Sequence, residues 1–117
     1  MAAISAQSQA RLVRWHGGQH PTLEAITRLM HEERLQPYVW VNAPNCRLPV
    51  RSHGYAKTIF CVQGSLEIII PDTRQRLTLG AGDRLDLPRG MRYGTIVGPY
   101  GAQCVEGAHR RDEREAV

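Results

Sequence analysis

Short runs of β-branched, aromatic and aliphatic residues are separated by turn residues over most of this chain. Each run is followed within two residues by Gly, Pro or Asn, and together the runs cover residues 38–41, 58–62, 66–70, 76–79, 84–87, 95–97 and 103–106. Many short strands with a turn signal every ~8–12 residues are typical of an antiparallel sandwich or barrel. The pattern therefore predicts an all-β domain.

Two further elements are predicted before these strands. Residues 11–15 fit one short strand, and Thr22 offers a side-chain cap for a helix. Apolar residues then recur at helical spacing, which predicts one amphipathic helix over residues 22–34, ended by Pro37. We expect the apolar stripe of this helix to pack onto the β-structure through Leu23, Ile26, Leu29 and Met30.

The chain has 117 residues, of which 42% are hydrophobic, and this size suits one domain with one core. Within that domain, residues 1–36 supply the first strand and the helix. Residues 37–108 form the β-structure, and residues 109–117 form a charged tail. We found no internal repeat and no low-complexity stretch.

Composition argues against several classes of protein. No run of about 18 apolar residues occurs, so we expect no membrane span. The first residues lack an apolar signal segment, and the three cysteines, Cys46, Cys61 and Cys104, form no CxxC pair, which favours reduced thiols in the cytoplasm. The net charge is +4, but the arginines are scattered and the densest cluster, at 109–115, is nearly balanced, so we expect no nucleic-acid partner.

The spacing of two segments resembles the paired motifs of the cupin superfamily. The first motif has the form HxH, three or four residues, Glu, six residues, Gly, and it corresponds to residues 51–64. The second has the form Gly, five residues, PxG, two residues, His, and it corresponds to residues 82–93. The resemblance implies a cupin-type jelly-roll barrel, a double-stranded β-helix, with one N-terminal α-helix. It places the chain among small single-domain bacterial cupins, many of which have no assigned activity.

The metal-binding positions of these motifs are altered. In metal-dependent cupins three His and one Glu hold a divalent ion, whereas this chain keeps only His53 and has Arg51, Lys57 and Tyr93 at the other positions. Arginine and protonated lysine have no lone pair to give a metal. We therefore expect no tight metal site and no cofactor.

The altered positions still indicate a pocket. Alternate residues of an extended segment share one face, and the resemblance implies that the face carrying residues 51, 53, 55, 57, 59 and 61 is the barrel interior. Thr58, Phe60 and Val62 then face another layer or a partner subunit. The predicted ligand-binding residues are Trp40, Arg51, His53, Tyr55, Lys57, Cys61 and Tyr93.

Arg51 and Lys57 together could bind a carboxylate or phosphate inside the barrel, and two like charges there would lower the pKa of Lys57. The competing interpretation places both side chains in solvent at the barrel mouth, with Cys61 a core residue. The leading hypothesis is a binding protein for a small anionic molecule.

Two enzymatic alternatives remain. Metal-free sugar-nucleotide epimerases of the superfamily pair a His with a Tyr, so the resemblance implies an isomerase or epimerase using His53 and Tyr93, with Asp86 or Glu106 orienting the histidine. A cupin enzyme with a weak residual metal site at His53 is the other. We also expect a homodimer, because Phe60 and Val62 face outward and residues 66–70 are apolar on both faces.

Overall fold

Two long antiparallel strands, β4 (Lys57–Ile70) and β7 (Tyr93–Ala108), organise the fold. The computed structural model describes residues 9–109. Within them, five shorter strands and one 3₁₀ turn, η2 (Pro71–Thr73), complete the β-structure. These strands are β1 (Arg11–Val13), β2 (Tyr38–Asn42), β3 (Arg47–Arg51), β5 (Gln75–Leu79) and β6 (Arg84–Leu87).

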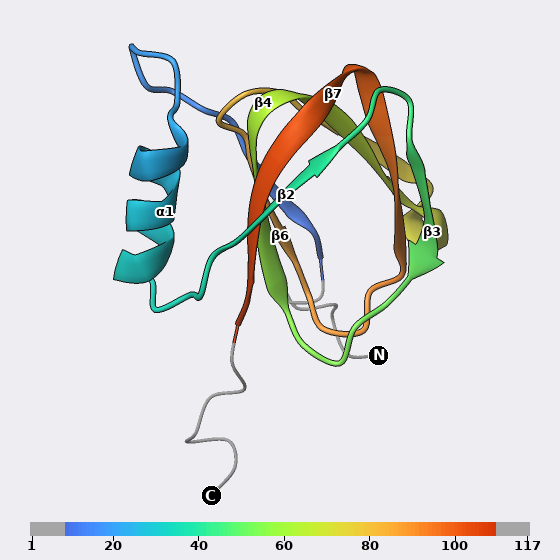
Figure 1. Cartoon of the computed structure of the whole chain (residues 1–117). Coiled ribbons are helices and arrows are strands. Elements are labelled where there is room, and N and C mark those ends of the chain that lie inside the picture. Colours follow the sequence, from blue (N-terminus) through green and yellow to red (C-terminus); the bar gives the residue numbers. More distant parts are fainter. Residues whose placement is uncertain (1–8, 110–117) are drawn as a thin grey trace, which may run out of the picture.

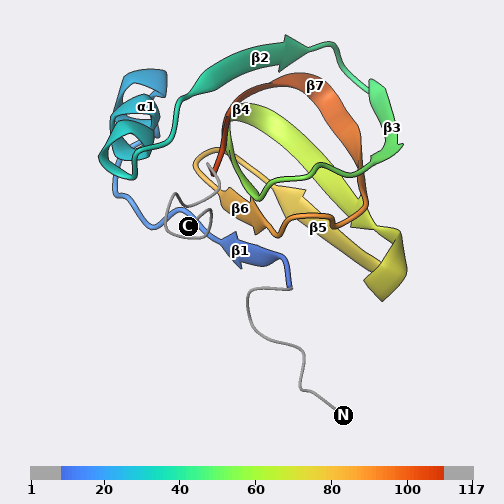
Figure 2. The same cartoon turned by 90° about the horizontal axis from the view of Figure 1, so that it is seen from below.

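The strands curl into a barrel that Figure 1 shows from the side and Figure 2 from one end. One path through the sheet has the order β1-β6-β4-β7-β2, while β3 pairs with β7 and β5 pairs with β4, and every pairing is antiparallel. The predicted all-β barrel with one helix is confirmed.

Each long strand spans two strands that the sequence pattern separated, and β3 was not predicted. The reason for the first difference lies at Gly64 and Gly101, where the register between β4 and β7 shifts. Both glycines have positive φ, +76° and +79°, and a Cβ on Gly64 would collide with the carbonyl oxygen of Gly101. The glycines therefore mark a sharp bend in continuous strands, where the sequence alone indicated a turn.

Helix α1 (Leu23–Glu32) begins as predicted, with the Thr22 hydroxyl accepting a hydrogen bond from the Ala25 amide at 3.1 Å. It ends two residues before the predicted position and well before Pro37. Arg34 adopts the left-handed conformation, with φ +63°, and its amide donates to the His31 carbonyl, which closes the last turn.

The helix covers the outer face of the barrel. Ile26 and Met30 are fully buried there, Leu23 packs against them, and Leu29 is 39% exposed, so the predicted stripe is wrong at Leu29 alone. Ile26 and Met30 belong to a hydrophobic core outside the barrel. It also contains Leu35 and the outward-facing side chains of the two long strands, namely Phe60, Val62 and Val105. Helix α1 is thus the layer that Phe60 and Val62 face, and these side chains are not available to a partner subunit.

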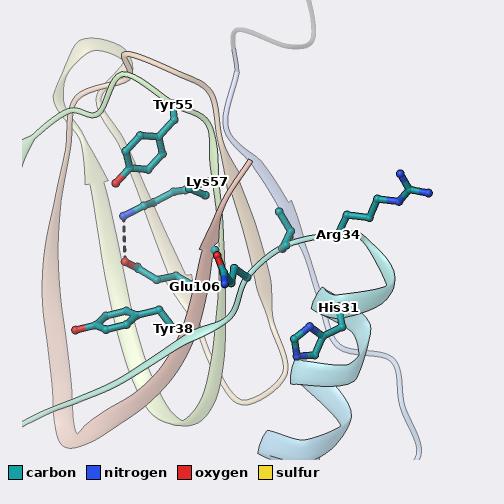
Figure 3. A pocket seen from close by; sticks show the side chains of 10 residues that line it. His31, Arg34, Tyr38, Tyr55, Lys57 and Glu106 are labelled. Carbon is teal, nitrogen blue, oxygen red and sulfur yellow. Dashed lines mark hydrogen bonds and ion pairs between the residues drawn. The ribbon is translucent and has the colours of Figure 1, made fainter. Parts of the chain in front are cut away.

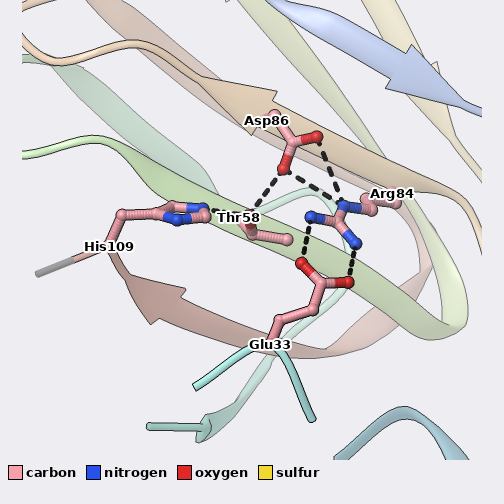
Figure 4. A network of polar contacts seen from close by, with 5 residues as sticks. All are labelled: Glu33, Thr58, Arg84, Asp86 and His109. Atoms are coloured by element: carbon pink, nitrogen blue, oxygen red, sulfur yellow. Dashed lines mark hydrogen bonds and ion pairs between the residues drawn. The ribbon is translucent and has the colours of Figure 1, made fainter. Parts of the chain in front are cut away.

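A polar network ties the end of α1 to the barrel (Figure 4). The Arg84 guanidinium donates to both carboxylate oxygens of Glu33, and through Nε to Asp86 at 3.1 Å. The Thr58 hydroxyl lies 2.6 Å from Asp86 Oδ1 and 2.7 Å from His109 Nε2. Because this hydroxyl has one proton and an ionised carboxylate only accepts, His109 Nε2 must carry a proton and donate to Thr58.

No helix in the described part of the chain is long and apolar enough to cross a membrane.

The last described residue, His109, donates its backbone amide to the Ala56 carbonyl at 2.8 Å, which anchors the end of β7 to the start of β4. The remainder of the predicted tail, residues 110–117, and residues 1–8 lie outside the described residues.

Candidate functional site

The candidate site forms where β4 and β7 begin and where β7 returns to the same end of the barrel. Lys57 opens β4 and is 5% exposed, and Tyr93 opens β7 and is 4% exposed. Arg51 pairs directly with Tyr93 across β3 and β7, and Glu106 pairs with Ile59 across β7 and β4. Strand pairing thus collects side chains that are far apart in the sequence.

Three of these side chains and His53 form a continuous hydrogen-bonded chain, which we call the internal relay: Glu106, Lys57, Tyr93 and His53. The Lys57 ammonium lies 3.1 Å from Glu106 Oε1 and 3.0 Å from the Tyr93 hydroxyl. The Tyr93 hydroxyl lies 3.1 Å from His53 Nε2. At the outer end, the His53 ring stacks on Tyr55 with 5.0 Å between ring centroids.

The direction of the Lys57–Tyr93 hydrogen bond follows from the groups present, and that of the Tyr93–His53 hydrogen bond depends on the tautomer of His53. An ammonium only donates, so Tyr93 accepts from Lys57 and is left with its own proton to donate. Burial lowers the pKa of His53, and the positive charges of Lys57 and Arg51 lower it further, so the imidazole is neutral at neutral pH. When the proton of the neutral ring is on Nδ1, His53 Nε2 is the acceptor for the Tyr93 proton.

The expected depression of the Lys57 pKa is wrong. Burial is the largest single effect and does lower this pKa, but the hydrogen bond to Tyr93 and the negative charge of Glu106 together outweigh it and raise the pKa of Lys57 above its ordinary value. From the sequence alone, Arg51 is the charged neighbour expected to set the pKa of Lys57. In the structure a carboxylate from the far end of β7 is the closer partner, so Lys57 is a stable cation.

Arg51 and Lys57 border two different, adjoining spaces. Arg51 is exposed at the end of β3 and lines a cavity of about 330 Å³ within the barrel. Lys57 lines a neighbouring groove of about 780 Å³ between the barrel and the end of α1. Within the described residues no carboxylate forms an ion pair with Arg51, while Lys57 is paired with Glu106.

Tyr38 and Glu106 border both spaces, so the inner cavity and the groove adjoin. Figure 3 shows Tyr38, Tyr55, Lys57 and Glu106 projecting to the same side, while His31 lies on α1 and the Arg34 side chain, beyond the end of α1, points away from them. The inner cavity has the mixed wall expected of a ligand site, with aromatic, apolar and polar members. They include Tyr38, Trp40, Leu48, Arg51, Ile59, Leu66, Tyr93, Thr95 and Glu106.

Three other predicted site residues lie in three different surroundings. Trp40 lines the inner cavity, whereas Tyr55 is 40% exposed and lines the groove. Cys61 is fully buried in the barrel core, paired in register with Cys104, and borders neither space. Its thiol lies 3.4 Å from the Gln63 carbonyl. This placement agrees with the competing interpretation of Cys61 as a core residue.

Neither carboxylate proposed to orient His53 does so. Asp86 bonds Thr58 and Arg84 in the network beside α1, and Glu106 bonds Lys57. The ion pair between Glu106 and Lys57 was not predicted, because the two residues are 49 positions apart and the local pattern around residues 103–106 indicates only a strand.

The internal relay does not fit the divalent metal that metal-dependent cupins hold. Among the described residues no three His, Cys, Asp or Glu side chains cluster closely enough to hold an ion. The two oxygen groups nearest to His53 along the relay are both bonded to the Lys57 ammonium. A fixed positive charge between them repels a divalent cation and occupies its oxygen donors.

No protein-family model matches this sequence, and no curated protein matches it either. Solved structures do match. An RmlC-like cupin from Shewanella frigidimarina aligns at 17% identity over 68% of this chain and 70% of its own, with a TM-score of 0.56.

Two other structures align comparably. The polyketide cyclase RemF from Streptomyces resistomycificus aligns at 24% identity over 65% of this chain and 55% of its own, with a TM-score of 0.56. A protein of unknown function from Rhizobium leguminosarum aligns at 16% identity over 66% of this chain and 71% of its own, with a TM-score of 0.59. These likenesses establish the fold.

Proposed function

We propose that this chain, which has the cupin fold, binds a small anionic molecule in its inner cavity and anchors it on Arg51. The observation that carries the proposal is the distribution of charge. Lys57 and Glu106 neutralise each other, and Arg51 has no carboxylate partner within the described residues. Two cations against one carboxylate leave one net positive charge, and it is at Arg51.

The rest of the cavity wall suits a small organic anion. A guanidinium offers a planar pair of donors that matches a carboxylate or sulfate. Leu48, Ile59 and Leu66 provide apolar surface, and Trp40 provides an aromatic face. A volume of about 330 Å³ lies at the lower end of the range for small-molecule sites.

The test is a thermal-shift screen of small carboxylates and sulfate on the wild type and two variants. Arg51→Gln removes the anchoring charge, and Arg47→Gln removes an exposed charge from the same strand that does not line the cavity. Anions should raise the melting temperature of the wild type and of Arg47→Gln, more at low salt, but not that of Arg51→Gln. Equal stabilisation of all three proteins would refute the proposal.

A second candidate function is metal-independent proton transfer on a bound carbon acid. It is favoured by the 3.1 Å contact between His53 Nε2 and the Tyr93 hydroxyl, with His53 neutral and thus able to act as a base. One structure of similar fold, RemF, is a polyketide cyclase. This candidate predicts that a bound carbon acid exchanges hydrogen for deuterium in D₂O, and that His53→Gln abolishes exchange while binding persists.

A further inference from the structure

We propose that anion binding at Arg51 is coupled to the uptake of a proton by His53, and that this proton redirects the Tyr93 hydroxyl toward the ligand. The inference rests on the proposed function and adds its regulation by pH. It follows from the order of donors and acceptors in the internal relay.

In the empty protein the Tyr93 proton is engaged. Lys57 donates to the Tyr93 oxygen at 3.0 Å, and with the His53 proton on Nδ1, Tyr93 donates to His53 Nε2 at 3.1 Å. The hydroxyl has one proton, so it has none left for a molecule in the cavity. An anion arriving beside Arg51 would meet the phenolic oxygen, which repels it.

Protonation of His53 reverses the last hydrogen bond. The imidazolium carries N–H groups at both ring nitrogens, so Nε2 becomes a donor to Tyr93. The Tyr93 oxygen then accepts from Lys57 and from His53, and its own O–H must turn away from both. Tyr93 pairs across the strands with Arg51 and lines the same cavity, so the released O–H has an acceptor there in an anion held by Arg51.

His53 is the member of this group whose charge can change near neutral pH. The charged and titratable groups that face it are Arg51 from β3, Lys57 from β4, Tyr93 and Glu106 from β7, and Tyr55 from its own segment. Arginine keeps its proton, and Glu106 holds Lys57 as an ammonium.

The electrostatics act in the same direction as the hydrogen bonds. Two cations beside His53 disfavour the imidazolium, and an anion at Arg51 offsets one of them. The proton comes from the solvent and adds to a ring lone pair, and no covalent bond of the ligand changes. Binding should therefore strengthen as the pH falls between the His53 pKa of the bound form and that of the empty form.

Calorimetry with sulfate tests the coupling, because sulfate does not titrate in the range concerned. Titrations in two buffers of different ionisation enthalpy should show net proton uptake approaching one proton per sulfate. The affinity should rise by up to about tenfold for each unit that the pH falls within the window.

Variants separate the coupling from the binding itself. In His53→Gln, sulfate should bind with no proton uptake and with an affinity that no longer depends on pH in this range. In Tyr93→Phe, the affinity should be lower because the ligand loses a donor. His20→Gln is the matched control, since His20 is exposed and borders neither space, and its proton uptake should equal that of the wild type.

The outcomes distinguish the two proposals. Sulfate that binds without proton uptake overturns the coupling and leaves the proposed function standing, whereas a wild type that binds no sulfate or carboxylate overturns both. Long-range ¹H–¹⁵N NMR of the empty protein gives an independent check. At pH above the window His53 should carry its proton on Nδ1, and a proton on Nε2 would contradict the inference whether or not any anion binds.

Discussion

The Lys57 ammonium lies 3.1 Å from the Glu106 carboxylate, and the two side chains are only 6% and 20% exposed. Each charge is therefore mostly removed from water and is compensated mainly by the other, and the Lys57 ammonium also donates to the hydroxyl of Tyr93. Such a pair adds little net stability compared with an apolar pair, but the loss of one partner leaves the other charge uncompensated.

Glu106→Gln should accordingly destabilise the protein by about 3 kcal/mol, measured by urea unfolding. The double variant Lys57→Met/Glu106→Leu should recover most of that loss, because it removes both charges. Glu67→Gln, which breaks an ion pair to the solvent-exposed Arg76, is the control and should cost far less. A double variant no more stable than Glu106→Gln would contradict this account of the pair.

His53 should make the empty protein less stable in mild acid. Its pKa in the folded state is below the ordinary value of 6.5, so the unfolded chain takes up the proton first as the pH falls. The contribution of neutral His53 to the free energy of unfolding is thus complete above that ordinary pKa. It is lost as the pH falls below it, and the free energy of unfolding then changes by at most about 1.4 kcal/mol per pH unit. Unfolding curves between about pH 7 and pH 5 should show this slope in the wild type.

His53→Gln should flatten the curve over the same range, whereas His20→Gln should leave it unchanged. The acidic groups with lowered pKa values, Glu33, Glu67 and Asp83, lose any stabilising contribution only at lower pH. An unaltered slope in His53→Gln would show that another group is responsible.

The bend of β4, where Gly64 lies against Gly101 of β7, should tolerate no side chain at Gly64. Gly64→Ala places a methyl group against the Gly101 carbonyl in a backbone conformation with φ +76°. We expect a loss of about 2 kcal/mol or more, seen as a lowered melting temperature. Gly54→Ala is the matched control, because no atom lies within 4 Å of its added Cβ and its φ is not positive.

We propose that any homodimer uses the free edge of β2. Among the described residues β2 pairs only with β7, and its outward side chains Val39 and Val41 are 41% and 69% exposed. Light scattering should show a dimer at high micromolar concentration, and Val41→Lys should shift it to a monomer. A wild type that is monomeric at this concentration would rule out the dimer.

Several features of this protein were determined by the sequence locally. The alternation at residues 57–62 placed Ile59 and Cys61 on one face and Phe60 and Val62 on the other, because neighbouring side chains on an extended strand point to opposite faces. The resemblance to the cupin motifs then identified the first face as the barrel interior. The Thr22 cap and the start of α1 were equally local. Motif spacing predicted the cupin barrel, since turns of set length between paired strands determine which residues meet.

Only the tertiary structure decided the chemistry of the site. The pKa of Lys57 depends on Glu106, which strand pairing brings within hydrogen-bond distance from 49 residues away. The same pairing brings Tyr93 against His53 and leaves Arg51 without a carboxylate in the described residues. Alternation tells which face a side chain occupies but not which charge will stand opposite it. Because electrostatic energies change steeply with distance and burial, the sign of the Lys57 pKa shift was set by its hydrogen bond to Tyr93 and by the charge of Glu106.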